Sequence, residues 1–170
     1  MIISTSAGLW SYNIGDTIKF TSRDPYRIIV SGRIKHFLSA FGEHVISEEV
    51  EKAMEAATKL HNVAIREFTV APKINPIDML PHHEWYVEFE NFPEDMSAFT
   101  KSLDNEMINQ NIYYKDLIDG KILKSLEVIS VERGGFNNYM KSVGRLGGQN
   151  KVPRLSNDRK IADKLKTINA

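Results

Sequence analysis

The alternation of apolar and polar residues predicts short strands in the N-terminal part of the chain. These strands are expected at residues 2–5, 16–22 and 26–31. The turn between the last two is formed by Arg23, Asp24 and Pro25. Because a pair of strands needs a third strand or a helix for stability, we expect residues 1–33 to be the end of a larger domain.

Past residue 33 the pattern becomes that of a compact α/β unit. Residues 36–40 and 43–46 are predicted as short strands, with Gly42 permitting the bend between them. Ser47 is the expected N-cap of a helix, since three glutamates follow in its first turn, where the helix dipole favours anions. The apolar positions of this helix recur at helical spacing and are expected to be buried: Val50, Ala53, Met54, Ala57 and Leu60.

The rest of the chain continues this alternation of strands and helices. Strands are predicted at 63–70, 84–90 and 126–131, and helices at 94–109, 136–143 and 158–168, with a turn or short helix at 113–118. Residues 71–83 form a loop with three prolines, and the final helix is expected to be exposed. The order of elements predicts an α+β fold: a small mixed or antiparallel sheet with helices mainly on one side, preceded by the strand pair.

Composition excludes several classes of protein. A chain of 170 residues with 42% hydrophobic and 26% charged residues is ordinary for a globular protein with one good core. No apolar run approaches the roughly 18 residues of a membrane span, so no membrane partner is expected. The absence of cysteine excludes disulfides and thiolate chemistry and fits a cytoplasmic location. The net charge of zero gives no general reason to expect nucleic acid.

The charges are nevertheless distributed unevenly along the chain. Residues 43–110 carry 14 acidic and 5 basic side chains, whereas residues 133–170 carry 2 acidic and 9 basic ones. A basic C-terminal segment can approach a phosphate-rich ligand, or it can simply be a solvated helix. Both interpretations remain open.

Two stretches carry candidate chemistry. Asp16 follows Gly15 at a strand edge, where a carboxylate can accept two hydrogen bonds from a vicinal diol, and Arg33 can serve the same sugar or its phosphate. The alternative is a turn with a surface charge. Near the end, residues 147–154 combine two glycines and Pro153 with the cations of Lys151 and Arg154, which suit a phosphate. By composition alone this is a basic loop.

Other catalytic patterns are missing from the sequence. His82 and His83 are adjacent, so on a strand they face opposite ways, and no partner stands at the spacing of a metal site. We therefore expect surface histidines and no metal site. The chain contains no phosphate-binding G-x-x-x-x-G-K-[ST], no dinucleotide-binding G-x-G-x-x-G and no serine nucleophile elbow.

Four segments, taken in order, carry a resemblance to a known family. They are SAGLWSYNIGD (6–16), GRIKHF (32–37), FGE (41–43) and GQNKVPR (148–154). Together they resemble the junction between the large and small domains of adenylate-forming enzymes, and more narrowly the auxin-responsive Gretchen Hagen family of acyl acid-amido synthetases in its bacterial form. The resemblance extends from residue 2 to about residue 155.

The resemblance implies a reaction in two steps. A carboxylic acid attacks the α-phosphate of ATP to give an acyl-adenylate and pyrophosphate, and an amino acid amine then displaces AMP to form an amide. ATP with Mg²⁺ and the two small substrates are the implied ligands, and the protein mainly positions groups and balances charge. The residues that would select the acid belong to a large N-terminal domain that this sequence lacks.

The resemblance also implies roles for individual residues. Residues 1–33 are the end of the large adenylating domain, and residues 34–170 are the small lid domain. Asp16, Arg33 and Tyr12 are assigned to the nucleotide, and Lys151 to the charge that develops on the α-phosphate. The assigned hinge and moving loop are Ile34 and Lys35, then Phe41, Gly42 and Glu43 with His44; Gln149 and Arg154 belong to the C-terminal catalytic loop. We expect the chain alone to be inactive.

Two functions of other classes remain as alternatives. One is a non-catalytic α/β interaction module that pairs with a partner or with itself through an exposed β-edge. The other is a nucleic-acid binder that uses the basic tail, although aromatic residues are poorly interleaved with those charges.

Overall fold

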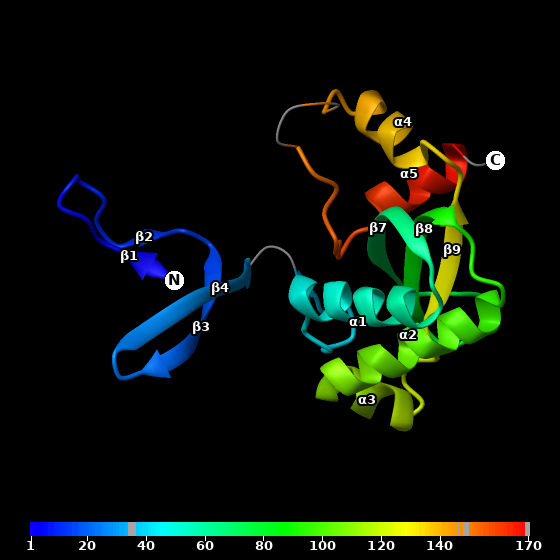
Figure 1. Ribbon diagram of the computed structural model, residues 1–170, viewed down its shortest axis with the longest axis horizontal. Helices are drawn as coiled ribbons and strands as arrows, with labels where there is room; N and C mark the ends of the chain where they lie inside the picture. Colours follow the sequence, from blue (N-terminus) through cyan, green and yellow to red (C-terminus); the bar gives the residue numbers. More distant parts are fainter. Residues whose placement is uncertain (34–36, 146, 148–149, 169–170) are drawn as a thin grey trace.

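The computed structural model describes residues 1–33, 37–145, 147 and 150–168. Two short and two longer strands make up the N-terminal part (Figure 1). A three-stranded sheet with helices makes up most of the rest. This arrangement confirms the predicted α+β fold. Among the described residues, no helix is both long enough and apolar enough to cross a membrane.

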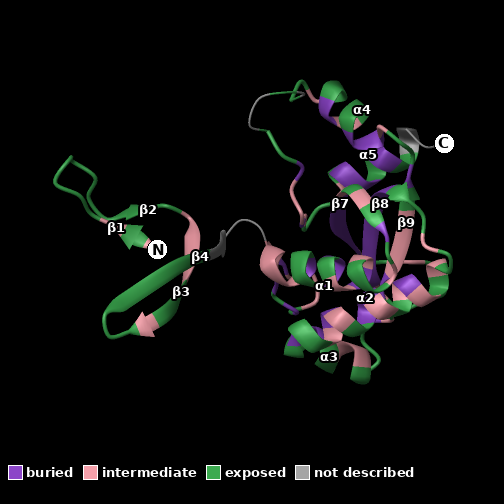
Figure 2. Ribbon diagram, viewed as in Figure 1, coloured by how far each residue is buried: buried purple, intermediate pink, exposed green. Residues whose placement is uncertain are grey.

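The N-terminal strands form two separate antiparallel pairs. β1 (Ile2–Ile3) pairs with β2 (Tyr12–Asn13), and β3 (Asp16–Arg23) forms a longer hairpin with β4 (Tyr26–Arg33). The hairpin leaves large apolar side chains exposed to solvent, and Figure 2 colours most of its described residues as exposed. The predicted strand pair is confirmed, and its origin in a larger domain stays a prediction.

The central sheet has the order β7-β8-β9, with β8 in the middle. β7 (Ala64–Lys73) runs antiparallel to β8 (His82–Asn91), and β9 (Glu127–Val131) runs parallel to β8, so the sheet is mixed as predicted. Both long strands extend into the predicted loop 71–83. Pro72 is tolerated within β7 because this is an edge strand.

One face of the sheet is covered by α1 (Ser47–Leu60), α2 (Met96–Gln110) and α3 (Ile112–Asp119). A short antiparallel pair, β5 (Phe37–Leu38) and β6 (Val45–Ile46), comes just before α1 in the chain. On β8, Trp85, Val87 and Phe89 point into this layer. The predicted stripe of α1 is buried except at its end, where Leu60 is 73% exposed. Ser47 is the first helical residue, not the N-cap, and the Glu49 carboxylate accepts a hydrogen bond from the Ile46 N–H at 3.0 Å.

The opposite face carries a second layer that the sequence did not predict. α4 (Gly135–Ser142) and α5 (Lys160–Ile168) pack there against Tyr86. Ile161, Ala162 and Leu165 of α5 are buried, so the prediction of an exposed final helix is wrong. These three positions share one helix face, and they complete a sheet with helices on both sides (Figure 2).

Candidate functional site

The basic segment near the C-terminus runs along the outer edge of β7. Val70 donates its N–H to the Arg154 carbonyl at 2.9 Å and accepts from the Ser156 N–H at 3.0 Å. The Thr69 hydroxyl donates to the Pro153 carbonyl at 2.7 Å. Through these bonds residues 153–156 pair with β7 in the parallel direction and extend the sheet at this edge. Lys151 lies two residues before this paired segment.

The side chain of Arg154 fastens this segment to two neighbouring elements. Its Nε donates to Glu51 Oε1 of α1 at 3.2 Å, and its Nη1 pairs with the Glu67 carboxylate of β7 and donates to the Phe68 carbonyl at 3.1 Å. The guanidinium also lies 4.5 Å above the centroid of the Phe68 ring. Arg154, which was predicted to belong to the catalytic loop, therefore contacts Glu51, Glu67 and Phe68 of the domain itself.

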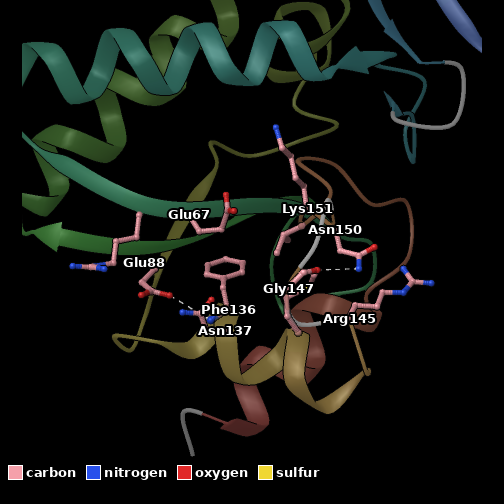
Figure 3. Close-up of a pocket in the computed structure, with 11 residues that line it drawn as sticks. Glu67, Glu88, Phe136, Asn137, Arg145, Gly147, Asn150 and Lys151 are labelled. Carbon is pink, nitrogen blue, oxygen red and sulfur yellow. Dashed lines mark hydrogen bonds between the residues drawn. The ribbon is translucent and has the colours of Figure 1, made fainter.

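Lys151 lines two adjoining cavities. One, of about 310 Å³, has a wall formed by Glu88, Phe136 and Asn137 (Figure 3). The other, of about 340 Å³, lies toward Ser47 at the start of α1. Glu67, Lys151 and Val152 belong to both linings. Lys151 is exposed, and in Figure 3 its side chain extends away from Phe136 and Asn137.

A buried carboxylate fixes the far wall of the first cavity. Glu88 is 4% exposed and accepts hydrogen bonds from the Gly134 N–H at 2.8 Å and the Phe136 N–H at 3.3 Å. These donors belong to the first turn of α4, where the helix dipole stabilises a negative charge. Gly134 has φ +84°, a left-handed conformation that favours glycine. The start of α4 is therefore held firmly against β8.

Two of the predicted nucleotide-binding residues, Asp16 and Arg33, lie at the open end of the N-terminal hairpin, opposite the turn that joins β3 to β4. Asp16 and Arg33 are direct Cα partners in the β3–β4 register, so the fold brings these two predicted residues together. The backbone carbonyl of Asp16 accepts from the N-terminal ammonium at 2.6 Å. Tyr12 lies on β2 and is 52% exposed. The predicted hinge, Ile34 and Lys35, lies outside the described residues, as does Gln149.

The predicted moving loop is tied to the sheet through a buried carboxylate. Glu43 is fully buried and accepts from the Phe41 N–H at 2.8 Å, and its other oxygen lies 3.0 Å from His83 Nε2. The Phe41 and His83 rings are stacked, with centroids 6.3 Å apart. Gly42, at φ +93°, makes the turn between Phe41 and Glu43. Its role as a moving loop stays a prediction.

The environment of Glu43 favours its charged form. Burial raises the pKa of Glu43, but the hydrogen bond from His83 and the backbone donors outweigh burial and leave this pKa below its usual value. The carboxylate is therefore ionised at neutral pH, and each of its oxygens has a protein partner.

The two adjacent histidines correct another prediction. They do face opposite ways, as expected of a strand, but His82 is 2% exposed and His83 is fully buried. The prediction of surface histidines is therefore wrong. Each ring meets a carboxylate from a distant part of the chain, Glu127 for His82 and Glu43 for His83. No local spacing in the sequence signals either pairing.

Comparison with known proteins places these features in a family. The family model described as "GH3 family C-terminal domain" matches residues 48–160. Two solved structures resemble the chain: a GH3.15 acyl acid amido synthetase, with a TM-score of 0.75 and 21% identity, and an AtGH3.15 acyl acid amido synthetase in complex with 2,4-DB, with a TM-score of 0.74 and 20% identity. Each match covers 98% of this chain and 32% of the other, so the chain spans about a third of these structures. No curated protein matches.

Proposed function

We propose that this chain, which belongs to the GH3 family through its C-terminal domain, is the lid domain of an ATP-dependent acyl acid-amido synthetase. The parent enzyme would adenylate a carboxylic acid and transfer the acyl group to the amine of an amino acid. In this proposal residues 1–33 end the large adenylating domain and residues 34–170 form the lid. The setting is the cytoplasm, which the absence of cysteine suits.

The position of Lys151 is the observation that carries the proposal. Its cation is exposed at the rim of two cavities, while the chain immediately after it is bonded into the sheet. A lysine presented in this way can balance charge that develops on a phosphate without moving the domain core. Arg154 and Gln149 belong to the same loop, and Arg154 positions it through Glu51 and Glu67.

The N-terminal hairpin supplies the ribose end of the proposed site. Asp16 binds the ribose hydroxyls and Arg33 binds the ribose or phosphate edge, with Tyr12 packed near the nucleotide. Their support is the direct pairing of Asp16 with Arg33 in the hairpin register. Mg²⁺ enters with the phosphates of ATP, and we assign it no ligand in this chain. Residues 34 and 35 are the proposed hinge, and residues 41–44 the loop that changes place between the two half-reactions.

The test uses the full-length enzyme and separates the two half-reactions. Lys151→Ala should lower ATP–pyrophosphate exchange by about 100-fold or more, the scale of losing one charge-stabilising group. Transfer from a supplied acyl-adenylate to the amine should change much less. Lys164→Ala, an exposed lysine on α5, is the matched control and should leave both steps unchanged. Unchanged exchange in Lys151→Ala would refute the assigned role.

A second candidate is an interaction module without catalytic activity, which the exposed hairpin favours. Phe20, Tyr26 and Val30 are 56%, 79% and 62% exposed, an apolar surface that suits a protein partner. Sedimentation of the isolated chain tests this alternative. Self-association that is lost in Tyr26→Asp would support the module, whereas a monomer that regains pyrophosphate exchange when mixed with the large domain would support the lid.

A further inference from the structure

The ring nitrogens of His82 are in unequal surroundings. His82 lies on β8, is 2% exposed, and has Nδ1 3.1 Å from the Leu80 carbonyl oxygen. A carbonyl oxygen can only accept, so Nδ1 carries the hydrogen. In the neutral ring Nε2 then carries a lone pair, and among the described residues no group donates a hydrogen bond to it. Buried polar atoms without a partner are rare and call for an explanation.

Two carboxylates lie near the His82 ring. Glu127 Oε2, on β9, lies 3.3 Å from His82 Nε2. Glu84, two residues along β8, is the direct register partner of Glu127 in the parallel pair. One ligand atom from each of the three residues lies within 4.8 Å of the other two. Three possible metal ligands thus lie close together, although Glu84 Oε2 already accepts a hydrogen bond from the Tyr86 hydroxyl at 2.8 Å.

We propose that His82, Glu84 and Glu127 bind a divalent transition-metal ion of the zinc class. One imidazole nitrogen and two carboxylate oxygens are a ligand set that Zn²⁺ accepts, with a fourth position left for water. A metal-binding histidine usually donates its other N–H to a carbonyl or carboxylate, as His82 does to Leu80. Glu127 is 44% exposed, so its carboxylate can rotate to complete the coordination.

The neighbouring cations set the strength of this site. Lys124 pairs with Glu127, Lys166 Nζ lies 3.1 Å from Glu84 Oε1, and Arg159 Nη2 lies 2.6 Å from Glu84 Oε2. The two lysine side chains are 30% and 45% exposed, so an arriving ion can displace them into solvent. Arg159 stays in place, because it also donates to the Pro72 carbonyl at 2.8 Å. Binding therefore competes with two ammonium groups and should be of moderate affinity.

The competition makes a specific prediction about Lys124. Replacing Lys124 with alanine frees one oxygen of Glu127 and removes a positive charge from the site. Zn²⁺ should then bind several-fold more tightly than to the unmodified chain. A surface site elsewhere, formed by exposed histidines or acidic residues, would not respond to this change.

Calorimetric titration of the 170-residue chain with ZnCl₂ tests the proposal. We expect one equivalent of Zn²⁺ to bind, and Glu127→Gln to weaken binding at least tenfold. His82→Gln should have the same effect, with circular dichroism to verify that each variant is folded. The matched control is His61→Gln, because His61 bonds to Ser102 elsewhere in the fold.

Several outcomes would overturn the proposal. No binding at millimolar ZnCl₂ would do so, as would full affinity in a folded Glu127→Gln. Loss of binding in His61→Gln alone would assign the ion to an adventitious site. If instead the nitrogen chemical shifts of His82 show an imidazolium at neutral pH that ZnCl₂ leaves unchanged, a proton occupies the place assigned to the metal.

Discussion

The N-terminal hairpin and the central sheet differ in the burial of their aromatic side chains. Tyr26 and Phe20 of the hairpin are 79% and 56% exposed, whereas Trp85 and Tyr86 of β8 are fully buried. The sheet has a helical layer on each face, whereas in the described part of the chain α1 contacts β4 but leaves the large apolar side chains of the hairpin exposed. The sheet therefore carries its own stabilising core, and the hairpin presents apolar surface suited to a neighbour.

The largest expected difference between the regions is in the cost of losing an aromatic side chain. Trp85→Ala should lower the free energy of unfolding by about 3–5 kcal/mol, because the ring is buried and stacked on Phe68. Tyr26→Ala should change it by less than about 0.5 kcal/mol. Urea unfolding of the two variants measures this. Similar losses would mean that the hairpin has a core of its own.

A smaller loss is expected where the sheet meets the loop that follows the hairpin. Glu43→Ala leaves the His83 N–H and the Phe41 N–H without their acceptor in a buried place, which should cost about 2–3 kcal/mol. Glu55→Ala, an exposed glutamate on α1, is the control and should be near neutral. A neutral Glu43→Ala would show that the loop is not held by this carboxylate.

The same carboxylate should make stability depend on pH. The folded-state pKa of Glu43 is depressed, so its contribution is complete above the unfolded value of 4.5 and is lost as pH falls through the lower folded value. The free energy of unfolding should therefore decrease on acidification in this range. In Glu43→Gln that decrease should be shallower, as urea unfolding at several pH values can measure. An identical slope in both proteins would contradict the shift.

A further loss, of about 1 kcal/mol, is expected at the sheet edge. Arg154→Ala removes the contacts to Glu51, Glu67 and Phe68, but the side chain is 31% exposed and water screens its ion pairs. Hydrogen exchange of the Ser156 N–H, which bonds to Val70, should speed up. Arg145→Ala is the exposed control. Unchanged exchange in Arg154→Ala would mean that the main chain alone holds the segment.

Removal of residues 1–33 should have the smallest effect of all. If the sheet with its two layers is self-sufficient, a chain that begins at residue 34 should fold with the same helical circular dichroism signal. Its stability should stay within about 0.5 kcal/mol of the longer chain. Unfolding of this shorter chain would show that the hairpin is part of the core.

Sequence patterns predicted the elements that have strong periodicity. The helical stripe at Val50, Met54 and Ala57 and the alternation at Trp85 and Val87 are local signals, and the structure confirms both. The burial of α5 was missed, because its apolar face is short and lies among basic residues. Two of those basic residues, Arg159 and Lys166, form ion pairs with Glu84 on β8, so the basic segment is not entirely exposed to solvent.

The candidate sites depended more heavily on contacts between distant residues. The pairing of Asp16 with Arg33 follows from a hairpin register that the turn implies, so the sequence could suggest it. The contacts of His83 with Glu43 and of His82 with Glu127 join residues about 40 apart in the chain. Such contacts depend on how strands pair, and periodicity carries no information about them.

The parallel addition of residues 153–156 to β7 bears on solubility. An uncovered sheet edge offers unpaired main-chain groups to other molecules, and such edges promote polymerisation. Here the stretch that follows Lys151 covers part of this edge, because the main-chain N–H and carbonyl of Val70 bond to the Arg154 carbonyl and the Ser156 N–H. A substitution that detaches this stretch would therefore expose an aggregation-prone edge of β7 as well as displace Lys151.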